Sequence, residues 1–305
     1  MKKILITGSN GLLGQKLIDL YLTMKDRQIL ATSRGGNRYV VQEGYQYASM
    51  DVTNKADVHK VVQSFRPDAI IHTAAMTNVD ACELDEVNCK LLNETAVRNI
   101  AEASKAVNAH LVALSTDFIF DGKAGPYKET DEPHPISIYG HSKLKGEEIV
   151  QEVGGKWSIA RTVLVYGVMS DMSRSNIVLW AKGALEKGQE INVVTDQFRT
   201  PTLAEDLAMG CYLIEKCQAE GIFNVSGKDF LNIYDIVSSV AEHFGLSMEK
   251  VSKISSKTLN QAAKRPPITG FDLTKSTEML GYEPHSFDEG IEIVYQQTEA
   301  LSKKE

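Results

Sequence analysis

Tyr139 and Lys143, four residues apart, are the side chains in this chain best suited to acid–base chemistry at a carbonyl group. Residues with that spacing share one face of a helix, so both side chains can reach the same reacting centre. A tyrosine hydroxyl can give a proton to the oxygen of a carbonyl that is being reduced, although its ordinary pKa is about 10. Because a neighbouring ammonium favours the phenolate, we expect Lys143 to lower the pKa of Tyr139.

A hydroxyl residue beside this pair would orient the substrate oxygen. Ser115 and Thr116 lie at the end of a predicted strand over residues 111–115, shortly before the pair. Successive side chains of a strand point to opposite faces, so only one of the two hydroxyls should face the site, and we assign that role to Thr116. The Tyr–Lys spacing occurs by chance on many helices, and its significance comes from the motifs that precede it.

A glycine loop near the start of the chain predicts a dinucleotide cofactor. Gly8, Gly11 and Gly14 follow a predicted strand over residues 3–7 and open a predicted helix over residues 12–24. In that context Gly8 allows a tight turn, Gly11 lets the backbone approach a pyrophosphate, and Gly14 permits close packing of helix on sheet. Besides Tyr139 and Lys143, the residues that we expect to contact the dinucleotide are Gly8, Asn10, Gly11, Leu12, Leu13, Gly14, Ser33, Arg34, Asp51, Val52, Thr73, Ala74 and Ala75.

The end of the second predicted strand, over residues 29–33, favours NADPH as the cofactor. An NAD site has an Asp or Glu there to accept a hydrogen bond from the ribose hydroxyl. This chain has Ser33 and Arg34 instead, and a guanidinium can pair with a 2′-phosphate. NADH stays the alternative, because the second interpretation of Arg34 is a solvated charge at a strand end. Asp51, which ends the third strand, is placed to contact the adenine.

The elements that must position these residues alternate between strands and helices. Apolar strands that alternate with helices indicate a parallel sheet covered on both faces. The predicted strands of the first half lie over residues 3–7, 29–33, 45–50, 69–73, 111–115 and 158–165. The predicted fold class is therefore α/β, with a Rossmann-type doubly wound parallel sheet and a smaller mixed α/β substrate lobe. We assign the cofactor-binding sheet to residues 1–167, completed by about residues 200–226, and the lobe to residues 168–199 and 227–305.

Composition excludes several classes of function. The chain has 305 residues and a net charge of −7, which argues against a nucleic-acid surface. Its four cysteines lack the spacing of a metal site and are too few for a disulfide framework, so we expect reduced thiols and no metal. No apolar stretch approaches the ~20 residues of a membrane span, and the predicted location is the cytoplasm.

Several segments resemble the dTDP-4-dehydrorhamnose reductase family, in the extended branch of the short-chain dehydrogenases/reductases. These segments are residues 66–80, 115–122, 126–132, 135–147, 161–167 and 196–202. The resemblance implies a reductase that uses NAD(P)H on the 4-keto group of a deoxysugar carried on dTDP, with Thr116, Tyr139 and Lys143 as catalytic residues. The residues that it implies around the substrate are Met76, Asn78, Thr116, Asp117, Phe118, Tyr139, Leu164, Gln197 and Arg199.

Three positions depart from the family's pattern and leave the sugar open. Leu164 stands where the rhamnose enzymes usually have a Trp near the sugar, and Arg199 stands where they more often have a small residue. Arg199 could contact a diphosphate, or it could form a structural pair with a carboxylate. Lys16 stands where a metal-binding member has Glu, so we expect no metal at that position.

Three functions therefore stay open. The first is the NADPH-dependent reduction of dTDP-4-dehydro-L-rhamnose to dTDP-L-rhamnose, and the second is a sibling reductase or epimerase reaction on another NDP-keto-sugar. The third is an NADP-binding regulatory role, because the beta subunit of methionine adenosyltransferase is similar to this family and keeps the Tyr-x-x-x-Lys pattern. Related enzymes often dimerise through helices such as those predicted over residues 79–108 and 137–153, so we also expect a homodimer. We interpret Glu147 and Glu148 as a solvated face of the second helix.

Overall fold

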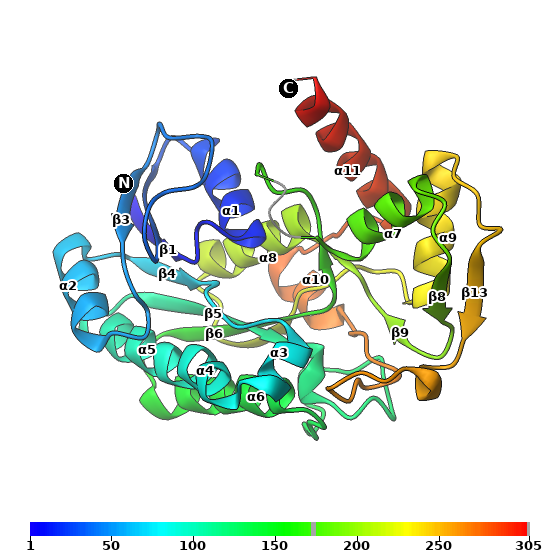
Figure 1. Cartoon of the computed structure of the whole chain (residues 1–305). Helices are drawn as coiled ribbons and strands as arrows, with labels where there is room; N and C mark the ends of the chain where they lie inside the picture. Colours follow the sequence, from blue (N-terminus) through cyan, green and yellow to red (C-terminus); the bar gives the residue numbers. More distant parts are fainter. Residues whose placement is uncertain (172–174, 304–305) are drawn as a thin grey trace.

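The centre of the structure is a seven-stranded parallel sheet, which confirms the predicted doubly wound α/β fold (Figure 1). This computed structural model describes residues 1–171 and 175–303. The strands are β1 (Lys2–Thr7), β2 (Arg27–Ser33), β3 (Gln46–Ser49), β4 (Ala69–His72), β5 (His110–Thr116), β6 (Trp157–Thr162) and β11 (Gly221–Asn224). Their order is β11-β6-β5-β4-β1-β2-β3, so it reverses between β1 and β4, where a doubly wound sheet opens its ligand crevice.

Helices cover both faces of the sheet because alternate residues of each buried strand point to opposite sides. These helices are α1 (Leu12–Leu22), α2 (Lys55–Phe65), α5 (Ala96–Ala106), α6 (Ile138–Val153) and α8 (Ala204–Cys217). Ile4 and Ile6 of β1 belong to the apolar cluster that includes residues of α1 and α8. Leu5 belongs to the opposite cluster, with residues of α2, α5 and α6. The alternation along β1 therefore holds a helix layer on each face.

The substrate lobe has an apolar core of its own, which includes Val178, Ile236 and Ile291. Its elements are α7 (Ile177–Glu186), α9 (Ile233–Phe244), α11 (Phe287–Ser302) and the parallel pair β8 (Ile191–Val194) and β13 (Val251–Ile254). Figure 1 shows them on the right of the sheet. The sequence did not predict β13 or α10 (Thr274–Leu280), because neither is a long apolar segment. The exact domain boundaries stay a prediction.

The helix predicted over residues 79–108 is divided into consecutive segments. They are α3 (Val79–Leu84), α4 (Glu86–Lys90), the π-helical turn η1 (Leu91–Thr95) and α5. Asp85 separates the first two, because its backbone leaves the helical region at φ −141° and its side chain caps α4 by accepting from Asn88 N at 3.0 Å.

The strand predicted over residues 158–165 is too long. β6 ends at Thr162, and Leu164 has φ +38°, a backbone conformation that is sparsely populated for a side chain of this size. The chain turns there, so that β7 (Val165–Tyr166) pairs with β10 (Thr202–Leu203) outside the main sheet. The sequence does not reveal this break, because the residues before and after Leu164 are apolar as well.

The helices described for residues 1–171 and 175–303 include none that is long and apolar enough to cross a membrane. The longest of them, α6 and α11, have 16 residues each, which is shorter than the ~20 residues that a helical span requires.

Candidate active site

The glycine loop joins β1 to α1 where the strand order reverses. Gly8 has φ +66°, and a Cβ there would lie 2.8 Å from Ala74 N. A Cβ on Gly14 would lie 2.5 Å from Gly8 O, so α1 can start this close to the loop only with glycine at that position. No side chain caps α1 at Gly11, and the buried Ser9 hydroxyl has no hydrogen-bond partner among the described residues. The loop thus fits the phosphates of a dinucleotide.

Asn10 supports the loop with its side chain. Its Nδ2 donates to Gly36 O at 3.0 Å, and its Oδ1 accepts from Arg38 N at 2.9 Å. Its backbone N donates to Ser33 Oγ at 3.1 Å. The side chain and the backbone N–H of Asn10 therefore fix the glycine loop against the end of β2 and the segment that follows it.

The adenosine end of the predicted cofactor site lies after β2 and β3. Arg34 is exposed, and its charge contributes to a lowered pKa of Asp51, after the larger effect of hydrogen bonds from Thr53. Thr53 N and Oγ1 donate to Asp51 Oδ1 at 2.9 and 2.7 Å. Arg34 and Asp51 thus lie close together, and the exposed guanidinium is accessible to a phosphate.

The residues at and just after the end of β4 form one wall of the site. Thr73 Oγ1 donates to Thr7 O at 2.6 Å, and Thr73 and Ala75 line the cavity described below. His72 is buried beneath them, with Nδ1 2.8 Å from Thr7 Oγ1. Burial and the charge of Lys143 lower the pKa of His72 to about 3, so this histidine is neutral near pH 7.

The first two turns of α6 carry the Tyr–Lys pair. Ser137 caps this helix by accepting from Gly140 N at 3.1 Å. Tyr139 and Lys143 are both buried, at 7% and 6% exposure. Both side chains line the cavity described below.

Thr116, at the end of β5, is the hydroxyl that contacts Tyr139 through a hydrogen bond. Thr116 Oγ1 also donates to Asp117 Oδ1 at 3.0 Å and accepts from Phe118 N at 3.3 Å. Ser115 lines the same cavity, and its buried hydroxyl has no partner within the described part of the chain. The structure therefore brings Thr116, Tyr139 and Lys143 together.

The pKa of Tyr139 is raised, and the expectation of a lowered value was wrong. Burial is the largest cause, since the ring packs with Cys82, Cys89 and Phe118. The hydrogen bond with Thr116 lowers the pKa, and the charge of Asp117 raises it. A protonated phenol is the state that can donate to an alkoxide, so the direction suits a reduction.

Lys143 faces the strand beneath it. Its Nζ donates to Leu114 O at 2.7 Å. Burial lowers the pKa of Lys143 to about 8, against the charge of Glu147, which raises it. An ammonium with a pKa near neutrality can exchange its proton at physiological pH.

Glu147 is buried, and the interpretation that it belongs to a solvated face was wrong. Arg161 Nε lies 2.9 Å from Glu147 Oε1 and Arg161 Nη2 lies 2.7 Å from Oε2, a two-point ion pair between α6 and β6. Glu148, the next residue, is exposed and pairs with Lys145 at 2.8 Å.

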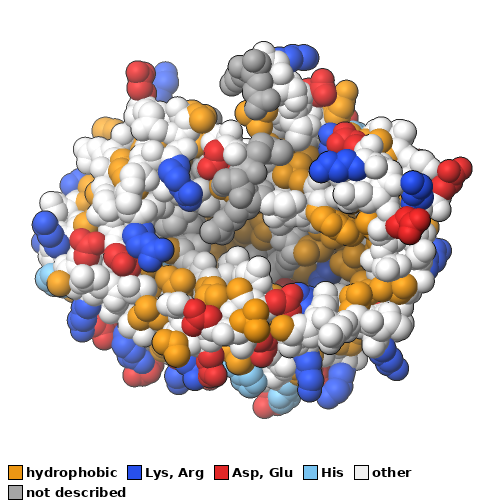
Figure 2. Space-filling model, in the orientation of Figure 1, with side chains coloured by type: hydrophobic (Ala, Val, Ile, Leu, Met, Phe, Trp, Pro, Cys, Tyr) orange, Lys and Arg blue, Asp and Glu red, His pale blue; other side chains and the backbone are white. Residues whose placement is uncertain are grey.

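A cavity of about 740 Å³ connects the glycine loop to the substrate lobe, and Figure 2 shows the hollow between the two halves of the molecule. From the cofactor half its lining includes Gly8, Gly11, Leu12, Leu13, Thr73, Ala75, Ser115, Thr116, Tyr139 and Lys143. Of the predicted substrate residues it includes Asp117, Phe118, Leu164, Gln197 and Arg199. Thr77 and Val79 line it, whereas the neighbouring Met76 and Asn78 are not among the described lining residues. Asn78 instead caps α3 by accepting from Ala81 N at 2.9 Å.

Several residues that line this cavity were not predicted from the sequence. They are contributed by the lobe and include Asn176, Ile177, Trp180, Asn192, Val193, Val194, Leu259, Gln261 and Arg265. Arg265 is held by Asp80 of α3, with Nη2 2.6 Å from Oδ2 and Nη1 3.2 Å from Oδ1. No local pattern signals this pair, since its members are 185 residues apart.

Arg199 forms the structural carboxylate pair that was one of its two expected roles. Its Nε lies 3.7 Å from Asp117 Oδ2, and both side chains are buried. Burial raises the pKa of Asp117, and Arg199 offsets part of that rise.

Lys16 joins three helices at the position where the family resemblance placed a metal-binding Glu. Its Nζ lies 2.9 Å from Glu205 Oε1 of α8 and donates to Gln297 Oε1 of α11 at 3.0 Å. Gln297 Nε2 in turn donates to Glu205 Oε1 at 2.6 Å. The ammonium thus supplies the positive charge that a carboxylate needs there.

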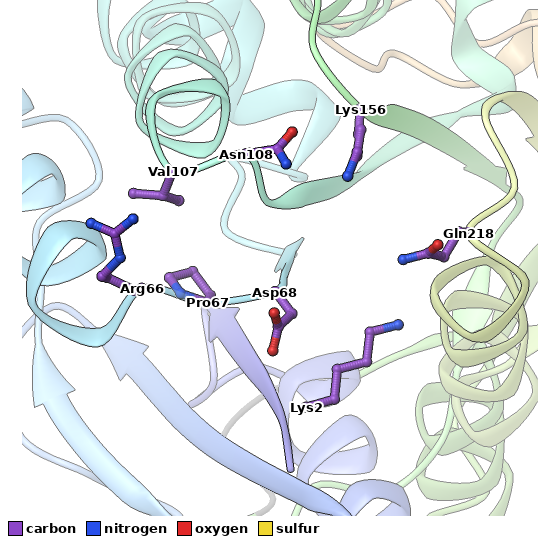
Figure 3. Close-up of a pocket in the computed structure, with 8 residues that line it drawn as sticks. All are labelled: Lys2, Arg66, Pro67, Asp68, Val107, Asn108, Lys156 and Gln218. Atoms are coloured by element: carbon purple, nitrogen blue, oxygen red, sulfur yellow. The ribbon is translucent and has the colours of Figure 1, made fainter.

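A second cavity, of about 490 Å³, lies at the amino-terminal ends of the sheet strands, opposite the candidate active site (Figure 3). α2 and α8 end there at Arg66 and Gln218, and α5 ends near Asn108, all three residues with positive φ. The C-termini of helices carry partial negative charge, which Lys2, Arg66 and Lys156 offset. Lys2 also forms an ion pair with the buried Glu215 of α8.

A family model, curated relatives and solved structures all match nearly the whole length of this chain. The family model of the RmlD substrate binding domain matches residues 1–300. The dTDP-4-dehydrorhamnose reductase of Aggregatibacter actinomycetemcomitans is 30% identical, over 95% of this chain and 97% of the relative. Methionine adenosyltransferase 2 subunit beta of Xenopus laevis is 29% identical, over 91% of this chain and 82% of the relative. Among solved structures, the Bacillus anthracis dTDP-4-dehydrorhamnose reductase in complex with NADP has a TM-score of 0.83 and 30% identity, covering 97% of this chain and 100% of that one.

Proposed function

Because this chain belongs to the dTDP-4-dehydrorhamnose reductase family of NAD(P)-dependent oxidoreductases, we propose that it reduces the 4-keto group of a nucleotide-linked deoxysugar with NADPH. The observation that carries the proposal is the cluster of Thr116, Tyr139 and Lys143 in a cavity that begins at the glycine loop. The proposed substrate is dTDP-4-dehydro-L-rhamnose and the product dTDP-L-rhamnose. The NADP complex of the B. anthracis relative and the exposed Arg34 support NADPH, with NADH as the alternative.

Each residue of the cluster has a separate task in this reaction. The nicotinamide cofactor, when bound, supplies the hydride that the keto carbon receives. Tyr139, which burial keeps protonated, donates its hydroxyl proton to the former keto oxygen, so that a secondary alcohol forms. Lys143 lies on the same helix face and supplies positive charge beside the tyrosine, and Thr116 orients the reacting oxygen.

The test is NADPH oxidation by the purified protein with dTDP-4-dehydro-L-rhamnose, beside a panel of other NDP-4-keto-sugars. Turnover of the dTDP-rhamnose precursor above the others supports the proposal. Preference for a different keto-sugar would identify the chain as a sibling reductase, and the absence of any turnover would refute the reductase function.

A second function is favoured by the similarity to the beta subunit of methionine adenosyltransferase 2, which covers 91% of this chain. Leu164 and the buried Arg199 also depart from the pattern of the rhamnose enzymes. We propose an NADP-binding regulatory subunit as the alternative, and tight NADP binding without turnover of any keto-sugar would support it.

We further propose a homodimer formed through α3, α4 and α6. Leu84 and Val87 support it, because they are apolar yet 81% and 79% exposed on α3 and α4. The cytoplasmic location stays a prediction.

A further inference from the structure

The substrate end of the cavity needs a cation, because the diphosphate of a nucleotide sugar is negatively charged and its oxygens accept hydrogen bonds. Among the described residues that line the cavity, the cationic side chains are those of Lys143, Arg199 and Arg265. Lys143 belongs to the catalytic cluster, and its Nζ donates to Leu114 O at 2.7 Å. The two arginines are therefore the candidates for binding a diphosphate.

The guanidinium of Arg199 is occupied by contacts within the protein. Its Nη1 donates to Phe198 O at 2.6 Å and to Pro267 O at 3.1 Å, and its Nη2 donates to Pro266 O at 2.7 Å. Its Nε lies 3.7 Å from Asp117 Oδ2, and the side chains of this ion pair are both buried. Since these contacts involve every nitrogen of the guanidinium, Arg199 has little capacity left for a diphosphate.

Arg265 uses only one edge of its guanidinium for Asp80. Its Nη1 donates to Asp80 Oδ1 at 3.2 Å and its Nη2 donates to Asp80 Oδ2 at 2.6 Å. The second hydrogen of Nη1 is used as well, because Nη1 also donates to Ala263 O at 3.3 Å. The N–H of Nε and one N–H of Nη2 are left, and they lie side by side on the other edge of the planar group. Two parallel N–H groups of this kind fit two oxygens of a phosphate.

The carboxylate of Asp80 fixes the direction of that free edge. Its Oδ1 accepts from Ala263 N at 3.0 Å, so Asp80 holds the backbone of the turn over residues 263–265 as well as the arginine side chain. The hydrogen bond from Arg265 lowers the pKa of Asp80, so the carboxylate is ionised near neutral pH and accepts all of these bonds. Asp80 belongs to α3, and Cys82 of the same helix packs with Tyr139. Arg265 is thus attached to the helix that packs against the proton donor.

We propose that Asp80 is a positioning residue for the substrate, which holds one edge of the Arg265 guanidinium so that the free edge binds the diphosphate of the nucleotide sugar. This inference rests on the proposed reductase function for the class of its ligand. Arg265 lines the cavity, whereas Asp80 is not among the described lining residues. Arg265 is therefore the residue that contacts the ligand, and Asp80 acts through it.

A carboxylate close to a phosphate site could also have the opposite effect, because it repels the phosphate and offsets the charge of the guanidinium. The two effects differ in sign when the charge of Asp80 is removed. If positioning dominates, Asp80→Asn weakens the binding of a diphosphate, and if repulsion dominates, the same substitution strengthens it. Both side chains are partly exposed, at 38% for Asp80 and 19% for Arg265, so neither substitution leaves a fully buried charge unpaired.

The test is titration calorimetry with dTDP and with thymidine, since only dTDP carries a diphosphate. UDP replaces dTDP in a parallel series, so that the result does not depend on the base. Arg265→Met should weaken dTDP binding by about 10–100-fold and leave thymidine binding unchanged. Arg265→Lys keeps the charge but not the pair of parallel N–H groups, so it should restore only part of the affinity. A wild-type protein that bound neither dTDP nor UDP would overturn the inference.

Asp80→Asn should weaken dTDP binding by less than Arg265→Met does. Adding Asp80→Asn to Arg265→Met should change nothing more, because Asp80 acts through Arg265. The matched control is Glu152→Gln, which alters another two-point pair, with Arg98 Nη1 and Nη2 3.3 and 3.0 Å from the two carboxylate oxygens. This control should bind dTDP as wild type does. Unchanged or tighter dTDP binding by Asp80→Asn would overturn the inference.

NADPH provides an internal control, because it also carries a diphosphate, for which the glycine loop is the proposed site. The affinity for NADPH should stay unchanged in Arg265→Met and in Asp80→Asn. Equal losses of NADPH and dTDP binding would mean that the substitutions disturb the whole fold, and would overturn the positioning role. With a keto-sugar that turns over, KM for the sugar should rise while kcat changes little.

The binding measurements need no turnover, so they separate this inference from the proposed function. If the wild type bound dTDP through Arg265 but reduced no keto-sugar, the reductase function would fail and the inference would hold. If the wild type reduced a keto-sugar and Arg265→Met kept its affinity for dTDP, only the inference would be refuted.

Discussion

Gly140 lies against Phe118 so closely that a Cβ at position 140 would come within 2.2 Å of the Phe118 carbonyl oxygen. Phe118 belongs to η2 (Asp117–Ile119), the turn that follows Thr116, and Gly140 follows Tyr139 in α6. The absent side chain therefore sets the distance between the two elements that carry the catalytic hydroxyls.

Gly140→Ala should separate these elements and reduce kcat by about 100-fold, since a displacement near 1 Å at a reacting centre has effects of that order. Overpacking should also lower the free energy of unfolding by ~1–3 kcal/mol. Steady-state kinetics and urea unfolding measure both effects. The control is Gly183→Ala in α7, where a Cβ would meet nothing within 4 Å, and wild-type kinetics are expected. Equal loss in both variants would contradict the role of the close contact.

Tyr139→Phe should bind NADPH as wild type does and lose turnover by a factor of about 10²–10⁴, because only the proton donor is removed. Fluorescence titration with NADPH and initial rates check the two halves of this prediction. Tyr295→Phe, which removes the hydroxyl of a 40% exposed ring on α11, should keep full activity. If Tyr139→Phe retained its activity, another group would have to donate the proton.

Arg34→Ala should raise KM for NADPH by about 10–100-fold and leave KM for NADH unchanged, because a charge-assisted hydrogen bond to the 2′-phosphate contributes about 1.5–3 kcal/mol. Arg98, whose side chain is 37% exposed, provides the control substitution. If KM rose equally for NADPH and NADH, the Arg34 guanidinium would not be binding the 2′-phosphate.

Glu147→Gln should lower the free energy of unfolding by about 3–5 kcal/mol, since it leaves the charge of Arg161 buried and unpaired. Glu148→Gln changes an exposed residue of the same helix and should cost less than ~1 kcal/mol. Urea unfolding of the two variants compares them directly, and similar stabilities would mean that the buried pair is not critical.

The paired substitution Leu84→Glu and Val87→Glu should convert the proposed homodimer to a monomer, because carboxylates would have to be buried in the interface. Light scattering coupled to gel filtration gives the mass. Met279→Glu, at an apolar residue of α10 that is 58% exposed, should keep the mass of the wild type. A monomeric wild type would disprove the proposal at once.

The parts of the site that the sequence predicted are those with local signals. Gly8, Gly11 and Gly14 are three residues apart at the junction of a strand and a helix, and Tyr139 and Lys143 lie about one helical turn apart on one face. Each of these patterns follows from backbone geometry over fewer than ten residues, so neighbouring residues are enough to reveal it.

The parts that could not be predicted depend on contacts between distant segments. The Asp80–Arg265 pair joins residues 185 positions apart, and the burial of Glu147 depends on Arg161 in the next strand. Leu164 looks like one more apolar residue of a strand, and only its φ of +38° shows that the chain turns there. The raised pKa of Tyr139 likewise depends on how deeply tertiary packing buries the ring.

The contact of Lys16 with Glu205 and Gln297 means that the cation which bridges α1, α8 and α11 is part of the polypeptide. A bound ion at such a junction exchanges with its surroundings, so the strength of the junction varies with the composition of the medium. The ammonium of Lys16 is instead present in every copy of the chain, together with Glu205 and Gln297. At this contact the last helix is therefore attached to the first by a side chain of the protein itself.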